Sequence, residues 1–206
     1  MNLSPLMIFP VLFPIVSGMA LMFFRPGTDE HRHRYETFVV LMNALLVFVS
    51  ITRAGDGTLT LWRATETLAL SFRMDELSKT FAVLVSVIWP IVTFYAFGYL
   101  KRRPPEDRFF AFFLTTLGIL IGIAYAANFL TLYLFYELLT FATLPLVMHS
   151  QKQEAIRAAM KYLFYSITGA CLALTGFFFF YRYGVSTNRS EEHTSELQSR
   201  SASRMP

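Results

Sequence analysis

The chain has 206 residues, of which 54% are hydrophobic and only 16% are charged, and its formal net charge is +4. Soluble domains are typically about half apolar but about one-quarter charged, so this balance excludes an ordinary soluble protein and indicates an integral membrane protein. The basic residues stand in short clusters between apolar runs, which argues against a nucleic-acid partner. The single cysteine, Cys171, excludes an internal disulfide.

Residues 1–24 carry no charged side chain and form the first predicted membrane span, since crossing a hydrocarbon core takes about 20 residues. A secretory signal peptide is the rival interpretation, but it needs a positive segment before its apolar run, and here Arg25 follows that run. Pro5, Pro10 and Pro14 are expected to kink the helix or to delay its start.

Residues 25–36 are predicted to form a polar turn, and residues 37–52 a second span whose only polar interruption of note is Asn43. The turn contains His31 and His33 beside acidic residues. Such a pair in a charged loop lacks the spacing of a recognised metal site. We therefore expect a solvated loop, not a metal centre.

Residues 53–75 are predicted to form a small extramembrane hairpin. After a Gly-Asp-Gly turn signal, residues 58–62 and 67–74 alternate polar with apolar side chains, which is the period of strands. The expected role of this hairpin is to cover helix ends.

Three further spans complete a predicted set of six. The third covers residues 80–100 and ends at the basic sequence KRRPPEDR. Residues 109–149 contain one charged side chain, Glu137, and would measure about 60 Å as one helix, so they must cross twice. The predicted break is residues 125–128, and the sixth span covers residues 155–181.

Basic residues are distributed unevenly over the two faces that these spans define. One face holds residues 25, 32, 34, 101, 102, 103, 108, 152 and 157, and the other holds residues 53, 63, 73 and 182. The positive-inside rule then places the N-terminus outside a bacterial or archaeal plasma membrane.

The last residues, 185–206, are polar and lack a helical hydrophobic pattern, so a disordered tail is predicted. Within it, RSEEHTSELQS at residues 189–199 resembles the conceptual translation of a short-read sequencing adapter. We expect residues from about Arg189 onward to be an artefact of the DNA that should be left out of reasoning about the fold.

Glu137 and Lys161 are the candidate functional residues, because each places an ionisable group within an apolar span. Burial disfavours their charged forms and a nearby opposite charge favours them, so a change in their separation would alter proton affinity. The predicted depths differ by about 6 to 7 Å along the helices. A proton relay is the leading hypothesis, and the alternative is a static pair in a structural anchor subunit.

Three stretches carry a resemblance to a known family: MDELSKTFAVLVSVIWPIVTFYAFGYL, NFLTLYLFYELLTF and EAIRAAMKYLFYSITGA. They resemble the antiporter-like membrane subunits of NADH:quinone oxidoreductase (complex I), membrane-bound hydrogenases and Mrp-type cation/proton antiporters. The resemblance implies that Glu137 is the essential glutamate of the family's fifth helix and that Lys161 matches the lysine of its sixth helix.

The same resemblance implies a fold of about fourteen helices with two inverted repeats, of which this chain would be an N-terminal fragment. Residues 1–106 would hold three helices and the hairpin, and residues 107–184 the start of the first repeat. The implied partners are lipid, other membrane subunits, and protons with sodium as a further cation. No redox centre or cofactor is expected, since one cysteine and no paired histidines at ligand spacing can hold neither haem nor iron and sulfur; any oxidoreductase activity would belong to the assembled complex.

Overall fold

The computed structural model describes residues 4–24, 28–53, 58–63, 69–100 and 106–202. Within this part, six helices are long and apolar enough to cross a membrane. The prediction of an all-α membrane protein with six spans and one hairpin is confirmed. In chain order the elements are η1 (Ser4–Ile8), α1 (Phe9–Phe23), α2 (Asp29–Arg53), β1 (Thr58–Arg63), β2 (Ala69–Arg73), α3 (Glu76–Leu100), α4 (Glu106–Ala124), α5 (Phe129–Val147) and α6 (Gln153–Ala202).

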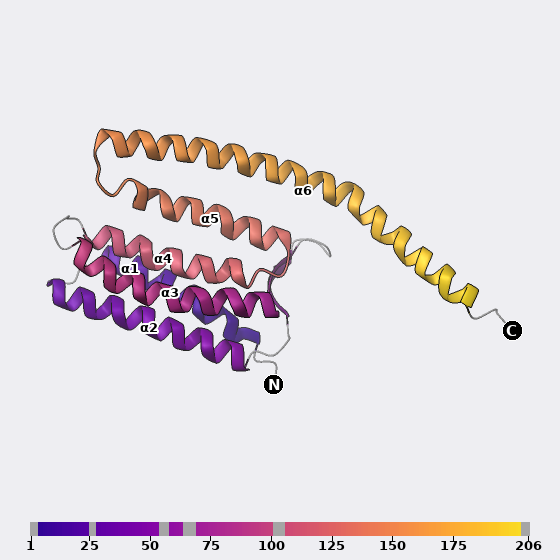
Figure 1. Ribbon diagram of the computed structural model, residues 1–206, viewed down its shortest axis with the longest axis horizontal. Helices are drawn as coiled ribbons and strands as arrows, with labels where there is room; N and C mark the ends of the chain where they lie inside the picture. The colour runs from indigo at the N-terminus through magenta and orange to yellow at the C-terminus, as the bar shows by residue number, and fades with distance from the viewer. Residues whose placement is uncertain (1–3, 25–27, 54–57, 64–68, 101–105, 203–206) are drawn as a thin grey trace. The chain divides into compact units, whose positions relative to one another are not determined.

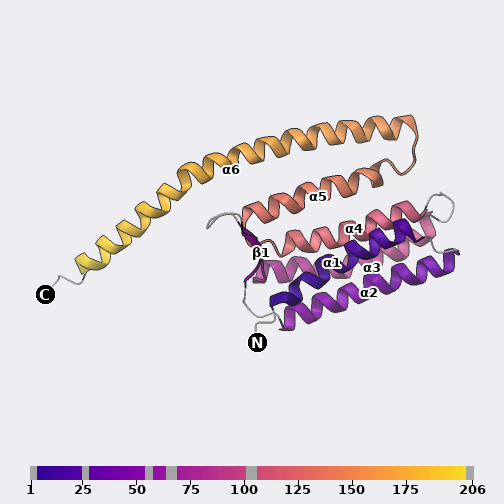
Figure 2. The same ribbon diagram turned by 180° about the vertical axis from the view of Figure 1, so that it is seen from behind.

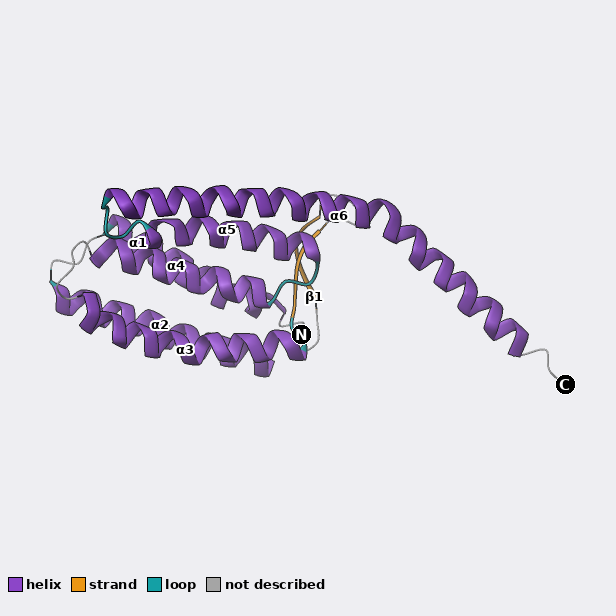
Figure 3. Ribbon diagram, turned by 45° about the horizontal axis from the view of Figure 1, so that its top comes forward, coloured by secondary structure: helices purple, strands orange, loops and turns teal. Residues whose placement is uncertain are grey.

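Helices α1 to α4 form an antiparallel four-helix bundle (Figures 1 and 2). Helix α1 packs against α2 and α4, and α3 packs against the same two helices, so that α1 and α3 stand on opposite corners. Helix α5 packs on the outer side of α4. In Figure 3 the strands lie across one end of the bundle, which we call the hairpin end, and the other end is called the basic end because it carries Arg32, Arg34 and Arg108.

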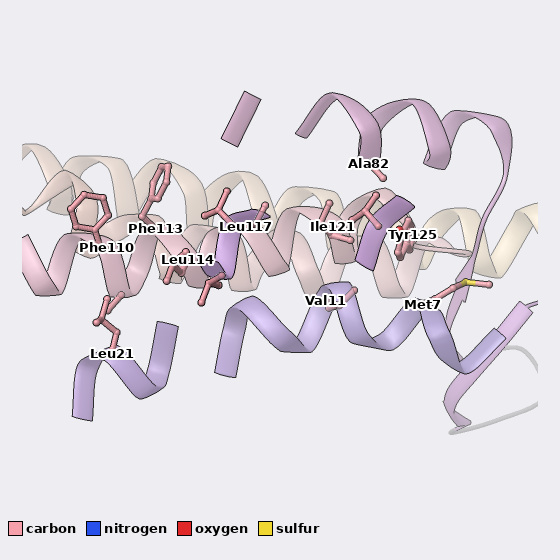
Figure 4. Close-up of a cluster of buried hydrophobic side chains, with 14 of the residues drawn as sticks. Met7, Val11, Leu21, Ala82, Phe110, Phe113, Leu114, Leu117, Ile121 and Tyr125 are labelled. Atoms are coloured by element: carbon pink, nitrogen blue, oxygen red, sulfur yellow. The ribbon is translucent and has the colours of Figure 1, made fainter. Parts of the chain in front are cut away.

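The apolar core of the bundle is built around α4, whose buried side chains include Phe110, Leu114, Leu117 and Ile121 (Figure 4). Helices α1 and α4 approach closely because both present glycine at the contact. A Cβ on Gly118 would collide with the Val11 carbonyl oxygen of α1. Small residues that let two backbones approach are typical of helix packing in membranes.

Helix α1 begins later than the apolar run that encodes it. A 3-10 turn, η1, occupies Ser4–Ile8, and α1 starts at Phe9 with Pro10 in its first turn, where a missing N–H costs nothing. Pro14 lies inside the helix. Of the two effects expected from the prolines, a kink or a delayed start, the structure shows a delayed start of the α-helix.

Helix α2 corrects the prediction of a polar turn at residues 25–36, because the helix begins at Asp29. Residues 25–27 lie outside the described part. The first turn carries Asp29 and Glu30, which the positive end of the helix dipole stabilises. Exposed Arg34 pairs with Glu30 one turn earlier at 2.6 Å, so the charged run supports a helix through i,i+4 pairs.

The hairpin has the predicted antiparallel pairing, with Leu59 opposite Phe72 and Thr60 opposite Ser71, and the register shifts between Thr60 and Trp62. Phe72 and Met74 are buried, as the alternation predicts. Residues 54–57 and 64–68 lie outside the described part.

The chain divides into two units, residues 1–163 and 164–206. Helix α6 runs to Ala202. Its part Gln153–Tyr183 is long and apolar enough to cross a membrane, in agreement with the predicted sixth span at residues 155–181. The disordered tail at residues 185–206 stays a prediction. Since no glycine or proline stands between Gly184 and Pro206, nothing in this segment forces a helix to stop. The resemblance of residues 189–199 to an adapter stays a prediction.

Candidate functional site

The helix that carries Glu137 begins at a well-defined cap. The Asn128 side chain accepts hydrogen bonds from the backbone N–H of Thr131 at 2.8 Å and from its hydroxyl at 2.9 Å. Asn128 has an extended backbone, as an N-cap residue should, and α5 starts at the next residue. The predicted break at residues 125–128 is thus confirmed.

The same cap is attached to the hairpin. The Asn128 amide donates to the Ala69 carbonyl at 2.7 Å and to the Ser71 hydroxyl at 2.9 Å. The backbone N–H of Ser71 in turn donates to the Thr131 hydroxyl at 3.0 Å, and Phe72 forms a β-bridge with Ala126. The hairpin therefore fixes the register of α5 against α4, which is more than covering helix ends.

Glu137 lies nine residues beyond this cap, about 13.5 Å along α5 and so near the middle of the span. Its side chain is half-buried, and its Oε1 atom is buried without a hydrogen-bond partner in the described part of the chain. Two residues earlier, the Phe135 ring lies against Gly122 of α4. A carboxyl oxygen shielded from solvent and unpaired is a candidate proton-binding site.

Lys161 lies in the third turn of α6 and is exposed. Within the described residues, no hydrogen bond or ion pair joins it to Glu137. The two helices meet instead at the hydroxyls of Thr143 and Tyr162, 3.2 Å apart. In an antiparallel pair this contact brings Lys161 near the level of Leu144, about 10 Å along the axis from Glu137.

The motif Asp-x-Leu-Ser before the third span proves to be a helix cap. Asp75 Oδ1 accepts a 2.8 Å hydrogen bond from the backbone N–H of Ser78 in the first turn of α3. This bond, followed by the Ser78 hydroxyl and Arg73, holds the pKa of Asp75 below its ordinary value. Lys79 pairs with Glu76 at 2.6 Å.

The structure also reveals a buried charge cluster that the sequence did not predict. Arg32 is 6% exposed and bridges α2 to α4 through Asp107 at 2.8 Å, while Glu36, which is fully buried, lies 3.8 Å from the same guanidinium. The i,i+4 spacing of Arg32 and Glu36 was the available signal. It was missed because this segment was predicted to be a turn.

Two histidines at the basic end, His33 and His149, pack against aromatic rings. His33 stacks on Phe97 with ring centroids 4.2 Å apart, and His149 meets Phe109 edge-on at 5.4 Å. His33 is therefore held on a helix and not in the solvated loop that was predicted. The described part of the chain contains no group of three or more metal-ligating side chains.

Two protein-family models match the chain. Residues 62–110 match the model described as NADH-Ubiquinone oxidoreductase (complex I), chain 5 N-terminus. Residues 126–203 match the model described as NADH:quinone oxidoreductase/Mrp antiporter, TM, and this range contains Glu137 and Lys161.

Curated relatives are similar over most of the chain. The Na(+)/H(+) antiporter subunit A1 of Staphylococcus haemolyticus is 28% identical over 165 residues, which cover 78% of this chain and 20% of the relative. A subunit of the same name from Staphylococcus aureus is 27% identical over 177 residues, covering 82% and 21%. The chain thus spans about a fifth of the length of these relatives.

A solved structure shares the fold. A chain of the membrane-bound sulfane sulfur reductase, an archaeal respiratory membrane complex, superposes with a TM-score of 0.63 at 16% sequence identity. The match covers 85% of this chain and 36% of that one. At this identity the likeness concerns the fold alone.

Proposed function

We propose, on the premise that the chain belongs to the antiporter-like membrane subunits of the NADH:quinone oxidoreductase and Mrp antiporter family, that it forms part of a subunit moving protons or other cations across a membrane. The relatives named Na(+)/H(+) antiporter subunit A1 support an exchange of sodium for protons. The host is a multisubunit complex in a bacterial or archaeal membrane, and its other membrane subunits are the partners.

Glu137 is the proton-binding group of this proposal. The single observation that carries it is the buried Oε1 atom near the middle of α5, which has no hydrogen-bond partner among the described residues. A carboxyl in such a place can take up a proton in one state and release it in another when a nearby positive charge moves. Because the Asn128 cap and the hairpin fix the helix on which Glu137 lies, the moving part of the relay is the cation and not the carboxylate.

Lys161 is the proposed second member. It lies about 10 Å along the axis from Glu137, so a proton would pass between them through water or through a further group. The two side chains form no direct pair in the described part of the chain. A static Glu–Lys lock, on which the structural-anchor alternative rests, therefore receives no support from this arrangement.

The proposed orientation places the N-terminus outside. The ends of the helices and strands carry Arg32, Arg34 and Arg108 at the basic end, and Arg53, Arg63, Arg73 and Lys79 at the hairpin end. Together with Lys152 and Arg157 in the α5–α6 region, this gives the basic end the greater positive charge, which the positive-inside rule assigns to the cytoplasm.

The test is a pair of substitutions, Glu137→Gln and Lys161→Met, introduced at the matching positions of a full-length relative. Each should abolish cation-coupled proton transport in sealed vesicles while the complex still assembles. Glu154→Gln is the matched control, because Glu154 is exposed in the first turn of α6. Unchanged transport in both variants would refute the relay.

A further inference from the structure

Three side chains in the four-helix bundle, one buried and two half-buried, hold buried polar atoms that form no hydrogen bond with any described residue. Asn43 lies on α2, and both its side-chain oxygen and its side-chain nitrogen are of this kind. Ser86 and Trp89 lie on α3, and the atoms concerned are the Ser86 Oγ and the Trp89 Nε1. Asn43 is 1% exposed. None of these atoms belongs to the site around Glu137, which lies on α5.

Asn43 and Trp89 lie on the sides of their helices that face the core, and Ser86 lies one turn after the buried Ala82 of α3. Asn43 is part of the buried stripe of α2 that also contains Val40 and Val47. On α3, Trp89 follows Ala82 by two turns on the face toward the core, and its ring stacks on Phe113 of α4 with centroids 4.7 Å apart. The bundle thus brings α2, α3 and α4 together around these groups.

The register of α2 against α3 sets the three residues at one level. His33 stacks on Phe97, and Val40 and Pro90 border the same narrow crevice between α2 and α3. In this antiparallel pair, residue 33 is therefore level with 97 and residue 40 with 90, so Asn43 is level with Val87. Ser86 and Trp89 then lie within about 3 Å of that level along the helix axis.

The hydrogen-bonding capacities of the three groups are complementary. The Trp89 ring offers one donor, the Asn43 amide two donors and an acceptor oxygen, and the Ser86 hydroxyl one donor with acceptor lone pairs. A buried polar group left unpaired costs about 1–3 kcal/mol. Buried water typically makes about three hydrogen bonds to groups of this kind.

We propose that Asn43, Ser86 and Trp89 bind one or a few internal water molecules at the centre of the four-helix bundle. This site is independent of the proposed role of Glu137 and lies on the other side of α4. On α2, Asn43 lies in the middle of a row of polar residues, with Glu36 and Ser50 each about 10 Å away along the helix axis, in opposite directions. The three residues lie within an arc of about 40° around the helix, so they share one face. The proposed water site is the centre of this row. At the hairpin end, Ser50 lies near the buried Tyr125 hydroxyl without the geometry of a regular hydrogen bond.

Trp89 provides a direct spectroscopic test, because the only other tryptophan, Trp62, lies on the exposed face of β1 and can be replaced. In a Trp62→Phe background, Trp89 fluorescence should increase in D₂O, and adding Asn43→Leu should shift its emission to the blue and remove the D₂O effect. Ser86→Ala should do the same with a smaller change of volume. Val47→Ala is the matched control on the same stripe, and it should leave the emission maximum unchanged. The proposal would be overturned if Trp89 fluorescence did not increase in D₂O and if neither substitution shifted its emission maximum.

Unfolding measurements give a second test that separates water binding from packing. If one water cluster bonds both residues, Asn43→Leu and Ser86→Ala should each lower the melting temperature, and the double variant should lose less than the sum of the two. Helical circular dichroism confirms that each variant is folded. In a dry site Asn43→Leu would remove an unpaired amide and raise the melting temperature, and that result, or strict additivity, would contradict the proposal.

Discussion

The Asn128 amide donates a 2.9 Å hydrogen bond to the Ser71 hydroxyl, which joins the first residue before α5 to the second strand of the hairpin. The same side chain caps α5 through Thr131. One residue thereby connects the extramembrane hairpin with the helix that carries Glu137, and the depth of the glutamate depends on it.

Replacing Asn128 separates its two roles. Asn128→Ala removes the cap and both bonds to the hairpin, and should destabilise the protein by about 1 kcal/mol for the cap, with more for the lost bonds. Asn128→Asp keeps an acceptor for Thr131 but cannot donate to Ser71. It should therefore lose only the stabilisation that comes from the bonds to the hairpin, and keep that of the helix cap. Thermal unfolding in detergent measures both, and equal losses would contradict this division.

The buried Arg32 should be among the least replaceable charges in the bundle. Arg32→Met leaves Glu36 buried without its neighbouring positive charge and should cost about 3–5 kcal/mol. Arg34→Ala, on the same helix, breaks an exposed pair in which the two side chains are 71% and 74% exposed, and should cost less than about 1 kcal/mol. Adding Glu36→Leu to Arg32→Met should recover part of the loss; a double variant as unstable as the single one would speak against a buried unpaired charge as the cause.

Close packing of α1 on α4 predicts an asymmetry between two glycines. Gly118→Ala would push a methyl group into the Val11 carbonyl and should destabilise the bundle by about 1–3 kcal/mol. Gly98→Ala on α3 has no atom within 4 Å of the new Cβ, and should be neutral or slightly stabilising because alanine favours a helix. The melting temperatures of the two variants measure the difference, and a similar loss in both would refute the packing argument.

The cap of α3 predicts a pH dependence at the hairpin end. Because the folded-state pKa of Asp75 is lowered, its charge stabilises the fold at pH values above its ordinary pKa of about 3.9. This contribution is lost as the pH falls through the lower folded-state pKa. Asp75→Asn keeps a capping oxygen but no charge, so it should melt below the wild type at neutral pH and together with it in strong acid. A gap between the two melting temperatures that is independent of pH would contradict this assignment.

The apolar pattern of the sequence predicted the membrane-spanning segments well, because a span must be a long run of uncharged residues that polar residues bound at each end. Small and polar residues predicted the break between α4 and α5 at residues 125–128. The alternation of polar and apolar side chains predicted the hairpin. The start of α2 was predicted wrongly, since Asp29 to Glu36 look like a loop by polarity, and only the i,i+4 pairing of opposite charges shows that they form a helix.

The sequence singles out Glu137 and Lys161 as candidate residues, whose roles stay predictions, but it does not contain their arrangement in space. Glu137 stands out in any apolar run, whereas its distance from Lys161 depends on how α5 and α6 slide against each other, and the Thr143–Tyr162 contact that sets this register has no sequence signature. Asn43 was noticed only as an interruption. That Ser86 and Trp89 lie level with it follows from the packing of α2 on α3, which a single sequence does not contain.

The most direct test of the central claim is the rate of proton translocation by a full-length relative in sealed vesicles, compared between Glu137→Gln and Glu137→Asp at the matching position. Glutamine keeps the size and polarity of the side chain but cannot bind and release a proton, so transport should fall to the background of empty vesicles. Aspartate keeps an ionisable carboxyl and should retain measurable transport. Full transport with glutamine at this position, in an assembled complex, would contradict the assignment of Glu137 as a proton-binding group.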